Sequence, residues 1–439
     1  SSHSSRLGAM ASASGSSSSS RTSARPSTAA PRCLGEGLWR GGPLRQTPDC
    51  DFFPRYSFAV AVLPTGMGLY ILGGREHSKF HNDIWLLQLS AEGAKWTEVS
   101  KHEDVRESGG RTVISKWAGR ERFSAAAATM ARRRRALYVC GGQGARQLMS
   151  DFWASEDGGT TWYCMRQSVP WGGRLEPGLA VVPAHYEQLV LFGGMSSGDW
   201  GAQMNADLWV SSDAGMNWEE IHAPTAEPRC APLLAFLPGA LPGGVRRLLV
   251  LGGTCMVKNT AGGYGIREGY VGDAWEGKLD VPARGATWRQ LGDPSQTSLS
   301  STGFNRFNAA FDPSWRWPDS STSTSGEQAW TGRGALVAHL EGRLLAAKPI
   351  APFEWVLTGP ADGAPPLPAA QSPVLQLALA AGPRAVLPRL FVLTAGAAFA
   401  STVSEVQRQR RWLLRLGEAL DAAGRLPLAL WRWRVLPAL

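Results

Sequence analysis

The sequence lacks an uninterrupted apolar segment that could cross a bilayer. The most apolar stretch, residues 374–399, is broken by Arg384, Arg389 and prolines, so it does not have the pattern of a transmembrane helix. The six cysteines form no Cys-x-x-Cys pair, and no Cys/His set has metal-ligand spacing. We therefore expect no transmembrane segment, no disulfide framework, no metal site and no cofactor.

The middle of the chain also lacks a concentrated basic region. Of the net charge of +9, residues 1–35 contribute four arginines without an acidic residue, and residues 401–439 contribute seven arginines against three acidic residues. The remainder is therefore close to neutral. Because a nucleic-acid-binding domain carries its excess charge on the folded face, no nucleic-acid partner is expected.

Residues 1–35 are rich in Ser and Arg and low in complexity. This composition cannot bury enough apolar surface to fold alone, so a disordered tail is predicted. A Ser- and Arg-rich segment without acidic residues is also typical of an organelle transit peptide. An intracellular location is favoured, and the tail is either unstructured or a signal for organelle import.

A motif recurs four times in the next part of the chain, roughly residues 36–292. Each copy has an apolar strand that ends in a glycine pair, an Asp-x-Trp unit and a closing tryptophan. The glycine pairs are Gly73-Gly74, Gly141-Gly142, Gly193-Gly194 and Gly252-Gly253, the Asp-x-Trp tryptophans are Trp85, Trp153, Trp209 and Trp275, and the closing tryptophans are Trp96, Trp162, Trp218 and Trp288. A period of this length predicts a repeat architecture.

An arginine precedes the first strand of each copy, at a nearly constant distance from the glycine pair. These arginines are Arg55, Arg122, Arg174 and Arg229. Each copy is predicted to form four strands, the first small and apolar, the second ending in the glycine pair, the third carrying Asp-x-Trp and the fourth beginning near the closing Trp. Small residues suit crowded inner strands, and indoles suit the wedge-shaped gaps between diverging outer strands.

The order of these motifs resembles the kelch repeat, which builds β-propellers. A second resemblance lies inside it: residues 155–162 have the pattern of an Asp-box, and residues 211–218 match it except at the Thr. That resemblance implies structural turns in which Asp157 and Asp213 accept backbone N–H groups. We therefore predict an all-β kelch-type propeller with structural roles for the repeated glycines and tryptophans.

The repeat weakens beyond residue 292. Residues 293–330 are rich in Ser, Thr and Pro and are predicted to be a loop or linker. Residues 331–439 are predicted to form two degenerate blades, which gives six blades in total. Within them, residues 333–338 resemble a first strand and residues 354–357 a fourth strand.

The last predicted blade is less regular. Residues 390–396 resemble a second strand, and Trp431 and Trp433 are candidates to close the sheet. Residues 403–423 have apolar positions at helical spacing and a glycine after them, so a C-terminal helix is also predicted.

In an antiparallel four-stranded blade, the connections after the second and fourth strands emerge on one face. Those after the second strand lengthen along the chain, and variable loops on a rigid scaffold are where recognition residues gather. From these loops we take Arg75, His77, Asp199, Trp200, Lys258, Tyr264, Arg267 and Tyr270 as candidate binding residues, since Tyr, Trp and Arg anchor many interfaces.

The four repeat arginines, Arg55, Arg122, Arg174 and Arg229, are further candidates on the same face. Converging guanidinium groups would pair with carboxylates or phosphates, whereas the alternative is that each binds neighbouring loop carbonyls. The sequence favours a scaffold that holds a protein partner, which could be acidic. The alternative is a hydrolase or isomerase acting on an acidic sugar, although the sequence shows no catalytic set and no metal ligands.

Overall fold

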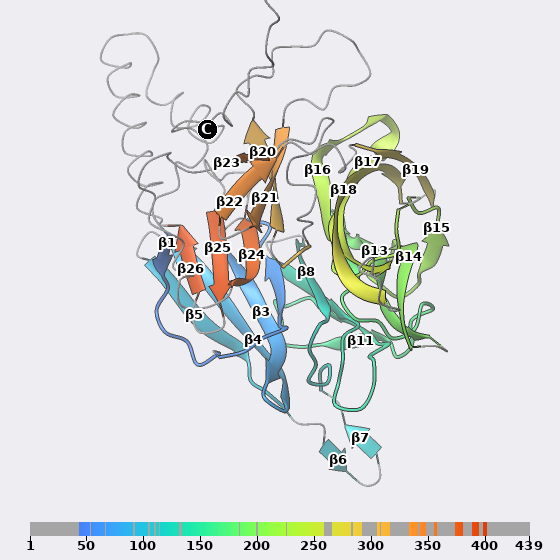
Figure 1. Ribbon diagram of the computed structural model, residues 1–439. Helices are drawn as coiled ribbons and strands as arrows, with labels where there is room; N and C mark the ends of the chain where they lie inside the picture. The colour runs from blue at the N-terminus through green and yellow to red at the C-terminus, as the bar shows by residue number, and fades with distance from the viewer. Residues whose placement is uncertain are drawn as a thin grey trace, which may run out of the picture.

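The computed structural model consists of β-strands grouped into sheets around a common centre (Figure 1). The structure describes residues 44–291 with short gaps that include 131–133, 199–200 and 259–265. Beyond them it describes residues 305–307, 309–316, 333–340, 343–347, 355–357, 374–380, 389–394 and 398–401. The predicted tail at residues 1–35, the predicted helix at residues 403–423, and Trp431 and Trp433 lie outside the described residues.

Within this part of the chain, the strands form six four-stranded antiparallel sheets and one short hairpin. The first sheet contains β2 (Ala59–Val62), β3 (Gly68–Glu76), β4 (Lys79–Ser90) and β5 (Gly93–Ser100). The second contains β8 (Ser124–Thr129), β9 (Arg135–Cys140), β10 (Phe152–Ser155) and β11 (Tyr163–Arg166). The hairpin of β6 (Arg106–Ser108) and β7 (Arg111–Val113) lies between them in the sequence.

The third sheet contains β12 (Gly178–Val182), β13 (His185–Gly198), β14 (Gly201–Ser211) and β15 (Glu219–Ile221). The fourth contains β16 (Leu233–Ala240), β17 (Arg246–Lys258), β18 (Ile266–Asp280) and β19 (Gly285–Gln290). The fifth contains β20 (Ala309–Arg316), β21 (Arg333–Leu340), β22 (Arg343–Ala347) and β23 (Trp355–Leu357). The sixth contains β24 (Val374–Ala380), β25 (Arg389–Thr394), β26 (Ala398–Ser401) and β1 (Leu44–Gln46).

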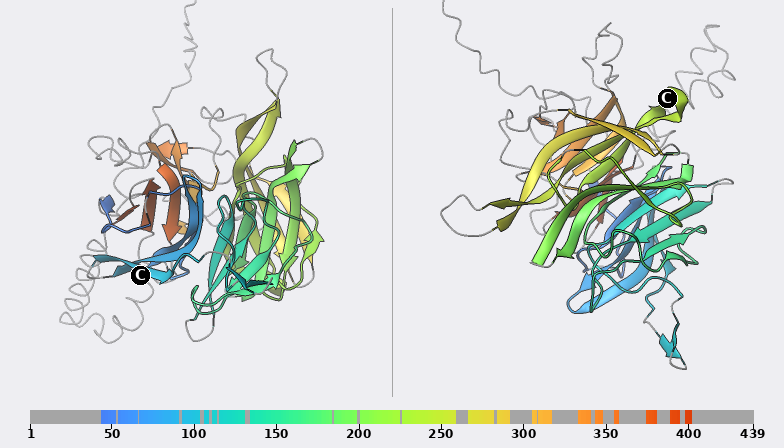
Figure 2. Two further views of the ribbon diagram at one scale, coloured as in Figure 1. Left: turned by 90° about the horizontal axis from the view of Figure 1, so that it is seen from below. Right: turned by 90° about the vertical axis from the view of Figure 1, so that its right-hand side faces the viewer.

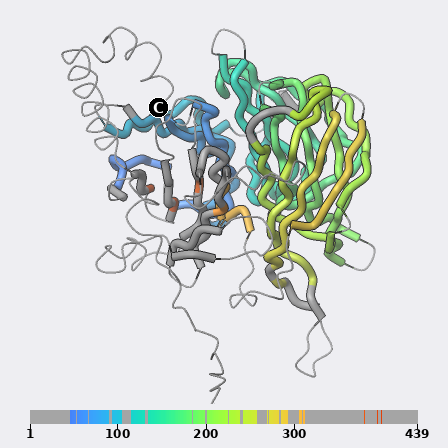
Figure 3. The backbone as a smooth tube through the Cα atoms, turned by 90° about the horizontal axis from the view of Figure 1, so that it is seen from above, coloured from blue at the N-terminus to red at the C-terminus, as the bar shows by residue number. Residues whose placement is uncertain are grey.

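The innermost strands of neighbouring sheets contact one another in a closed cycle. The cycle runs β2, β8, β12, β16, β20, β24 and back to β2. Figure 3 shows the first sheet, in blue, on one side of the molecule and the sheets of residues 124–290, in cyan to yellow, on the other. Strand β1 joins the last sheet by pairing with β26, with Leu44 opposite Ser401. The start of the described chain therefore closes the circle, and the predicted all-β propeller is confirmed.

The core lies in the layers between adjacent sheets. Between the first and second sheets, Ile84 and Leu137 are fully buried and pack with Trp153 and Trp162, each 6% exposed. Between the second and third sheets, Trp218 packs edge-on against Phe152, with ring centroids 5.2 Å apart. Indoles thus fill the space between diverging sheets, which is the physical reason for their recurrence in the sequence.

A buried ion pair ties the repeated residues of each of the first four sheets together. In the second sheet, Arg120 donates Nη1–H and Nη2–H to the Asp151 carboxylate at 2.6 and 2.7 Å and also donates to the Gly141 carbonyl at 3.1 Å. The Trp153 indole N–H donates to the same carboxylate at 2.7 Å. The corresponding sets are Arg55/Gly73/Asp83/Trp85, Arg174/Gly193/Asp207/Trp209 and Arg229/Gly252/Asp273/Trp275.

These pairs correct one residue of the predicted repeat. The arginine of the second sheet is Arg120, fully buried, and not Arg122, whose side chain is 30% exposed and pairs with Glu176. The sequence offers an arginine at both positions. Only the side chain at position 120 reaches the Asp-x-Trp unit of its own sheet.

The glycine pairs have a second role, in joining each sheet to the next. The N–H of Gly142 donates to the Arg174 carbonyl at 2.6 Å, and Gly74 and Gly194 make the same bond to Arg120 and Arg229. Gly141 has a φ of 68°, and a Cβ built on it would lie 2.5 Å from the Arg174 carbonyl oxygen. A residue other than glycine is therefore disfavoured at position 141, because the positive φ would be strained and because its Cβ would clash with the Arg174 carbonyl.

In two turns, at residues 155–162 and 211–218, an aspartate side chain accepts backbone N–H groups. Asp157 accepts the N–H groups of Thr160 and Thr161 at 3.0 and 2.9 Å. In the third sheet, Asp213 accepts the N–H of Asn217 at 2.8 Å. These bonds lower the pKa of both carboxyl groups against the opposing effect of burial.

The C-terminal sheets differ from the prediction in two places. Strand β20 lies inside residues 293–330, which the sequence predicted as loop or linker. As a result, residues 333–338 belong to the second strand of the fifth sheet, β21, and not to its first strand. The predicted fourth strand near residues 354–357 is β23, and the predicted second strand near residues 390–396 is β25.

We predict that Arg120→Met lowers the free energy of unfolding by about 3 to 5 kcal/mol, because it leaves the Asp151 carboxylate buried without its cation. Urea denaturation measures the change. Arg134→Met is the matched control, since Arg134 pairs with Glu156 where both side chains are more than half exposed, and it should cost no more than about 1 kcal/mol. Equal losses in the two variants would contradict the structural role of the buried pair.

Candidate functional site

Five residues form a ring at one end of the central channel. They are Ser57, Arg122, Glu176, Ala231 and Arg306, and we call them the mouth ring. The backbone N–H of each of the last four members donates to the carbonyl of the member before it, at 2.9, 2.8, 2.7 and 3.0 Å in chain order. The first four have φ between 50° and 55°. Each of these four stands two positions after the buried arginine of its sheet, so the repeat itself places them there.

Charged side chains at the mouth ring pair with one another. Arg122 Nε donates to Glu176 Oε1 at 2.7 Å, and the Cys230 thiol lies 3.4 Å from Glu176 Oε2. On the neighbouring rim, Arg75 Nη1 donates to Glu121 Oε1 at 3.0 Å. The Arg75 side chain remains partly exposed, at 36%. The mouth therefore combines cations and carboxylates within hydrogen-bond reach.

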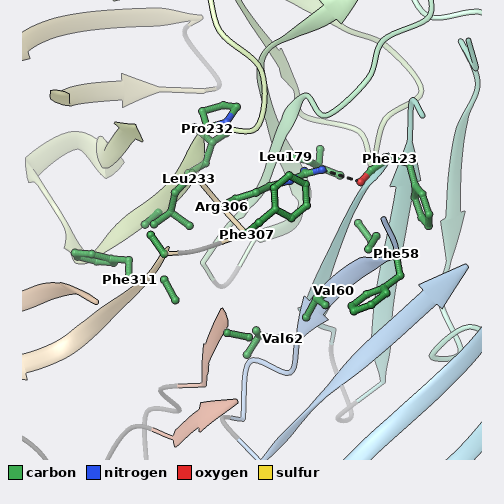
Figure 4. Close-up of a pocket in the computed structure, with 17 residues that line it drawn as sticks. Phe58, Val60, Val62, Phe123, Leu179, Pro232, Leu233, Arg306, Phe307 and Phe311 are labelled. Atoms are coloured by element: carbon green, nitrogen blue, oxygen red, sulfur yellow. Dashed lines mark hydrogen bonds between the residues drawn. The ribbon is translucent and has the colours of Figure 1, made fainter. Parts of the chain in front are cut away.

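Arg306 comes from the fifth sheet and reaches across the channel. Its guanidinium donates to the carbonyls of Phe123 and Pro177 at 2.9 and 3.1 Å and to Ser124 Oγ at 2.5 Å. Phe123 and Ser124 belong to the second sheet and Pro177 precedes the third. The guanidinium thus links the fifth blade to the second and the third. Figure 4 shows its bond to the Phe123 carbonyl as a dashed line.

Behind the mouth ring lies a cavity of about 240 Å³ inside the channel. Val60, Leu179, Leu233 and Phe311 contribute apolar side chains from four different innermost strands, and Arg306 stands at one side of the space (Figure 4). The innermost strands pair with a neighbour on one edge only. Their other edges face the channel and offer backbone polar groups to water.

A second hollow lies outside the channel, beside the turn between β3 and β4. Its volume is about 770 Å³, and it is lined by Lys79, Phe80, His102, Arg146 and residues around them. Lys79 and Arg146 are exposed cations. This hollow is formed by the first two sheets on the same face as the mouth ring.

The predicted binding residues fall into three groups. Arg55, Arg174 and Arg229 are at most 7% exposed and bind their own Asp and Gly partners. Each of these three arginines also donates to a glycine carbonyl of its own sheet. Arg122 lies in the mouth ring, and Arg75 and His77 lie beside it, joined by a bond of 2.6 Å from Arg75 Nε to the His77 carbonyl.

The remaining candidates lie on the long hairpins or outside the described residues. Lys258 ends β17, and Arg267 and Tyr270 lie in β18, opposite Val257 and Thr254. Asp199, Trp200 and Tyr264 lie outside the described residues.

Sequence reasoning did not identify Glu176, Cys230 or Arg306. A signal for Glu176 is present in the sequence: like Ser57 and Ala231, it stands two positions after the buried arginine of its sheet. This signal can be used only after the buried arginines have been assigned. Arg306 gives no such signal because its partners lie far away in the sequence. No group of three or more His, Cys, Asp and Glu side chains suited to a metal ion occurs among the described residues.

His81 is a buried titratable group next to this face. It is 5% exposed, and neither ring nitrogen has a hydrogen-bond partner, although Glu76 Oε2 lies 3.5 Å from Nε2. Burial and the Arg55 guanidinium lower the pKa of His81 to about 4, while the Asp83 carboxylate acts in the opposite direction. His102, with its ring centroid 5.1 Å away, and Lys79 also favour the neutral form.

Comparisons with known proteins do not identify a family for this chain. No protein-family model matches the chain, and no curated protein matches it. Among solved structures, one titled "Structure of YjhT" is similar, with 13% sequence identity and a TM-score of 0.45 over 81% of this chain and 95% of that chain. Similarity at this level carries no information about what this chain binds. No helix long and apolar enough to cross a bilayer is found in the described residues.

We predict that wild-type protein loses about 2 kcal/mol of stability between about pH 7 and pH 5 through His81. The unfolded state binds a proton below its ordinary pKa of 6.5, whereas the folded state does not until about pH 4. His81→Phe removes this part of the loss, as measured by urea denaturation at several pH values. The depressed pKa of Asp83 acts only below this window.

His185→Phe is the control, because His185 is exposed. It should leave the pH dependence unchanged. Parallel stability curves for wild type and His81→Phe would show that His81 is not held in its neutral form.

Proposed function

We propose that this chain is a kelch-type propeller that holds a protein partner, through an acidic segment, on the face of the mouth ring. The kelch assignment is supported by the four Arg/Gly/Asp/Trp sets, which occur in the same order with the same bonds. The observation that most supports an acidic partner is the hollow between the first two sheets, because the basic residues Lys79 and Arg146 line it.

Hairpins surround this face and extend the surface that a partner would meet. The β13–β14 ladder continues past the glycine pair to Gly198 and Gly201, and the β17–β18 ladder continues to Lys258 and Ile266. A register shift occurs at the glycine pair in both ladders, and such shifts bend a strand and redirect its end. The hairpin β6–β7 also projects from the body of the molecule (Figures 1 and 2).

The charge on the hollow indicates the kind of partner. Lys79 and Arg146 are exposed, and Glu103 is the acidic residue among the residues that line this hollow. Exposed guanidinium and ammonium groups accelerate association with acidic segments and contribute specificity. The aromatic ring of Phe80 lies in the same wall and offers apolar contact beside the charges.

The alternative function, a hydrolase or isomerase acting on an acidic sugar, requires a carboxyl group available for proton transfer. At the mouth, Glu121 is engaged by Arg75, and Glu176 by Arg122 and Cys230. These bonds support a positioning role for both carboxylates. The scaffold function is therefore better supported than the enzyme.

We predict that Arg146→Glu weakens binding of an acidic partner about tenfold or more, because it replaces an attractive charge by a repulsive one in the hollow. Proteins captured by the full chain are identified, and their affinities for wild type and variant are compared by biolayer interferometry at two salt concentrations. Binding to wild type should weaken as salt rises.

Arg134→Glu is the matched control. Arg134 is also an exposed arginine, but it lies before β9, at the opposite end of the strand from the glycine pair. A partner that is lost with Arg134→Glu and retained with Arg146→Glu would place the interface on the other face and refute the proposal.

A further inference from the structure

The cation inside the channel lacks an anionic partner in the described part of the chain. The hydrogen bonds of Arg306 go to two backbone carbonyls and one hydroxyl. These acceptors are uncharged, and they use only part of the N–H donor set of a guanidinium. The carboxylate of Glu176, which lies near it in the mouth ring, is already engaged by Arg122 and Cys230.

Removing a cation from water without pairing it with an anion costs free energy. An anion that binds beside Arg306 would recover part of this cost, so the arrangement favours anion binding. Burial lowers the pKa of the Arg306 guanidinium, while Glu176 raises it. Among the described residues at the mouth, Arg75 is bonded to Glu121 and Arg122 to Glu176. Arg306 makes no ion pair with a described residue.

The side chains that line the cavity next to Arg306 are apolar, while the free strand edges contribute backbone groups. Val60 and Val62 of β2, Leu233 of β16 and Phe311 of β20 line the cavity from different sheets. Figure 4 shows Val62 farther from Arg306 than Val60 is, along the direction of the strand. A ligand that fits this space has one anionic end and an apolar body that follows the innermost strands.

We propose that the central channel binds a small aliphatic carboxylic acid, with the carboxylate on Arg306 and the alkyl chain between the innermost strands. The cavity of about 240 Å³ suits a molecule of roughly ten non-hydrogen atoms, since each water occupies about 30 Å³ in the liquid. A carboxylate accepts two N–H bonds from a guanidinium side by side.

This site is separate from the proposed partner surface. Arg146 and Lys79 line the outer hollow and are absent from the channel wall, whereas Arg306 lines the channel and is absent from the hollow. Loss of one activity therefore does not imply loss of the other.

The test uses octanoate as the probe and isothermal titration calorimetry on the full chain. We expect octanoate to bind wild type, and octanol, which has the same chain without the charge, to bind at least about tenfold more weakly. Arg306→Met should reduce octanoate affinity by a similar factor. Arg134→Met, which removes an exposed arginine that is absent from the cavity lining, should retain binding.

Arg306 also joins three blades, so the loss of binding in Arg306→Met does not distinguish loss of the site from loss of the fold. Val60→Phe provides an independent variant, because it fills the channel and leaves the guanidinium in place. It should abolish octanoate binding while circular dichroism and the melting curve remain those of a folded propeller. Three outcomes would each overturn the proposal: equal affinity for octanol and octanoate, unchanged binding by Val60→Phe, and no binding by wild type. The third would show that the channel holds only water.

Discussion

The buried pairing of an arginine with an aspartate is the interaction on which the first four sheets depend. A guanidinium out of water is tolerated only with a well-aligned anion, and in each sheet an aspartate in the third strand, or directly before it in the second sheet, supplies it. The same carboxylate accepts the indole N–H of the tryptophan two positions on. Residues two apart on a strand share a face, which explains why the spacing Asp-x-Trp recurs.

The same interaction determines where the candidate site forms. The backbone carbonyl of each buried arginine from the second to the fourth sheet accepts the N–H of a glycine in the preceding sheet, so the pair joins blades as well as strands. Two positions later the chain turns through positive φ and forms the mouth ring. A structural motif therefore fixes the backbone there, while the side chains at the ring positions are not constrained by the motif and differ: Ser57, Arg122, Glu176 and Ala231.

Much of the fold follows from the sequence, because glycine pairs and indoles have strong local reasons to recur. The innermost strand of the fifth sheet, β20, could not be predicted from the sequence, because it lies among Ser, Thr and Pro residues that are typical of a loop. The prediction of Arg122 in place of Arg120 was wrong. The number of residues between the buried arginine and the glycine pair varies among the sheets by more than two, so this spacing cannot distinguish position 120 from position 122. Glu176 and Arg306 were missed because their contacts join different blades, and spacing along the chain carries no record of such contacts.

The distribution of charge separates two kinds of recognition in one molecule. Arg55, Arg120, Arg174 and Arg229 are neutralised by their aspartates and contribute to stability, so counting arginines overstates the charge available to a ligand. Lys79 and Arg146 face solvent, where screening limits each charge to a modest effect and a macromolecular partner can add many contacts. Arg306 faces a narrow cavity where water is limited and a single charge has a larger effect. The outer hollow therefore suits a protein segment, and the channel suits a small molecule with one charged end.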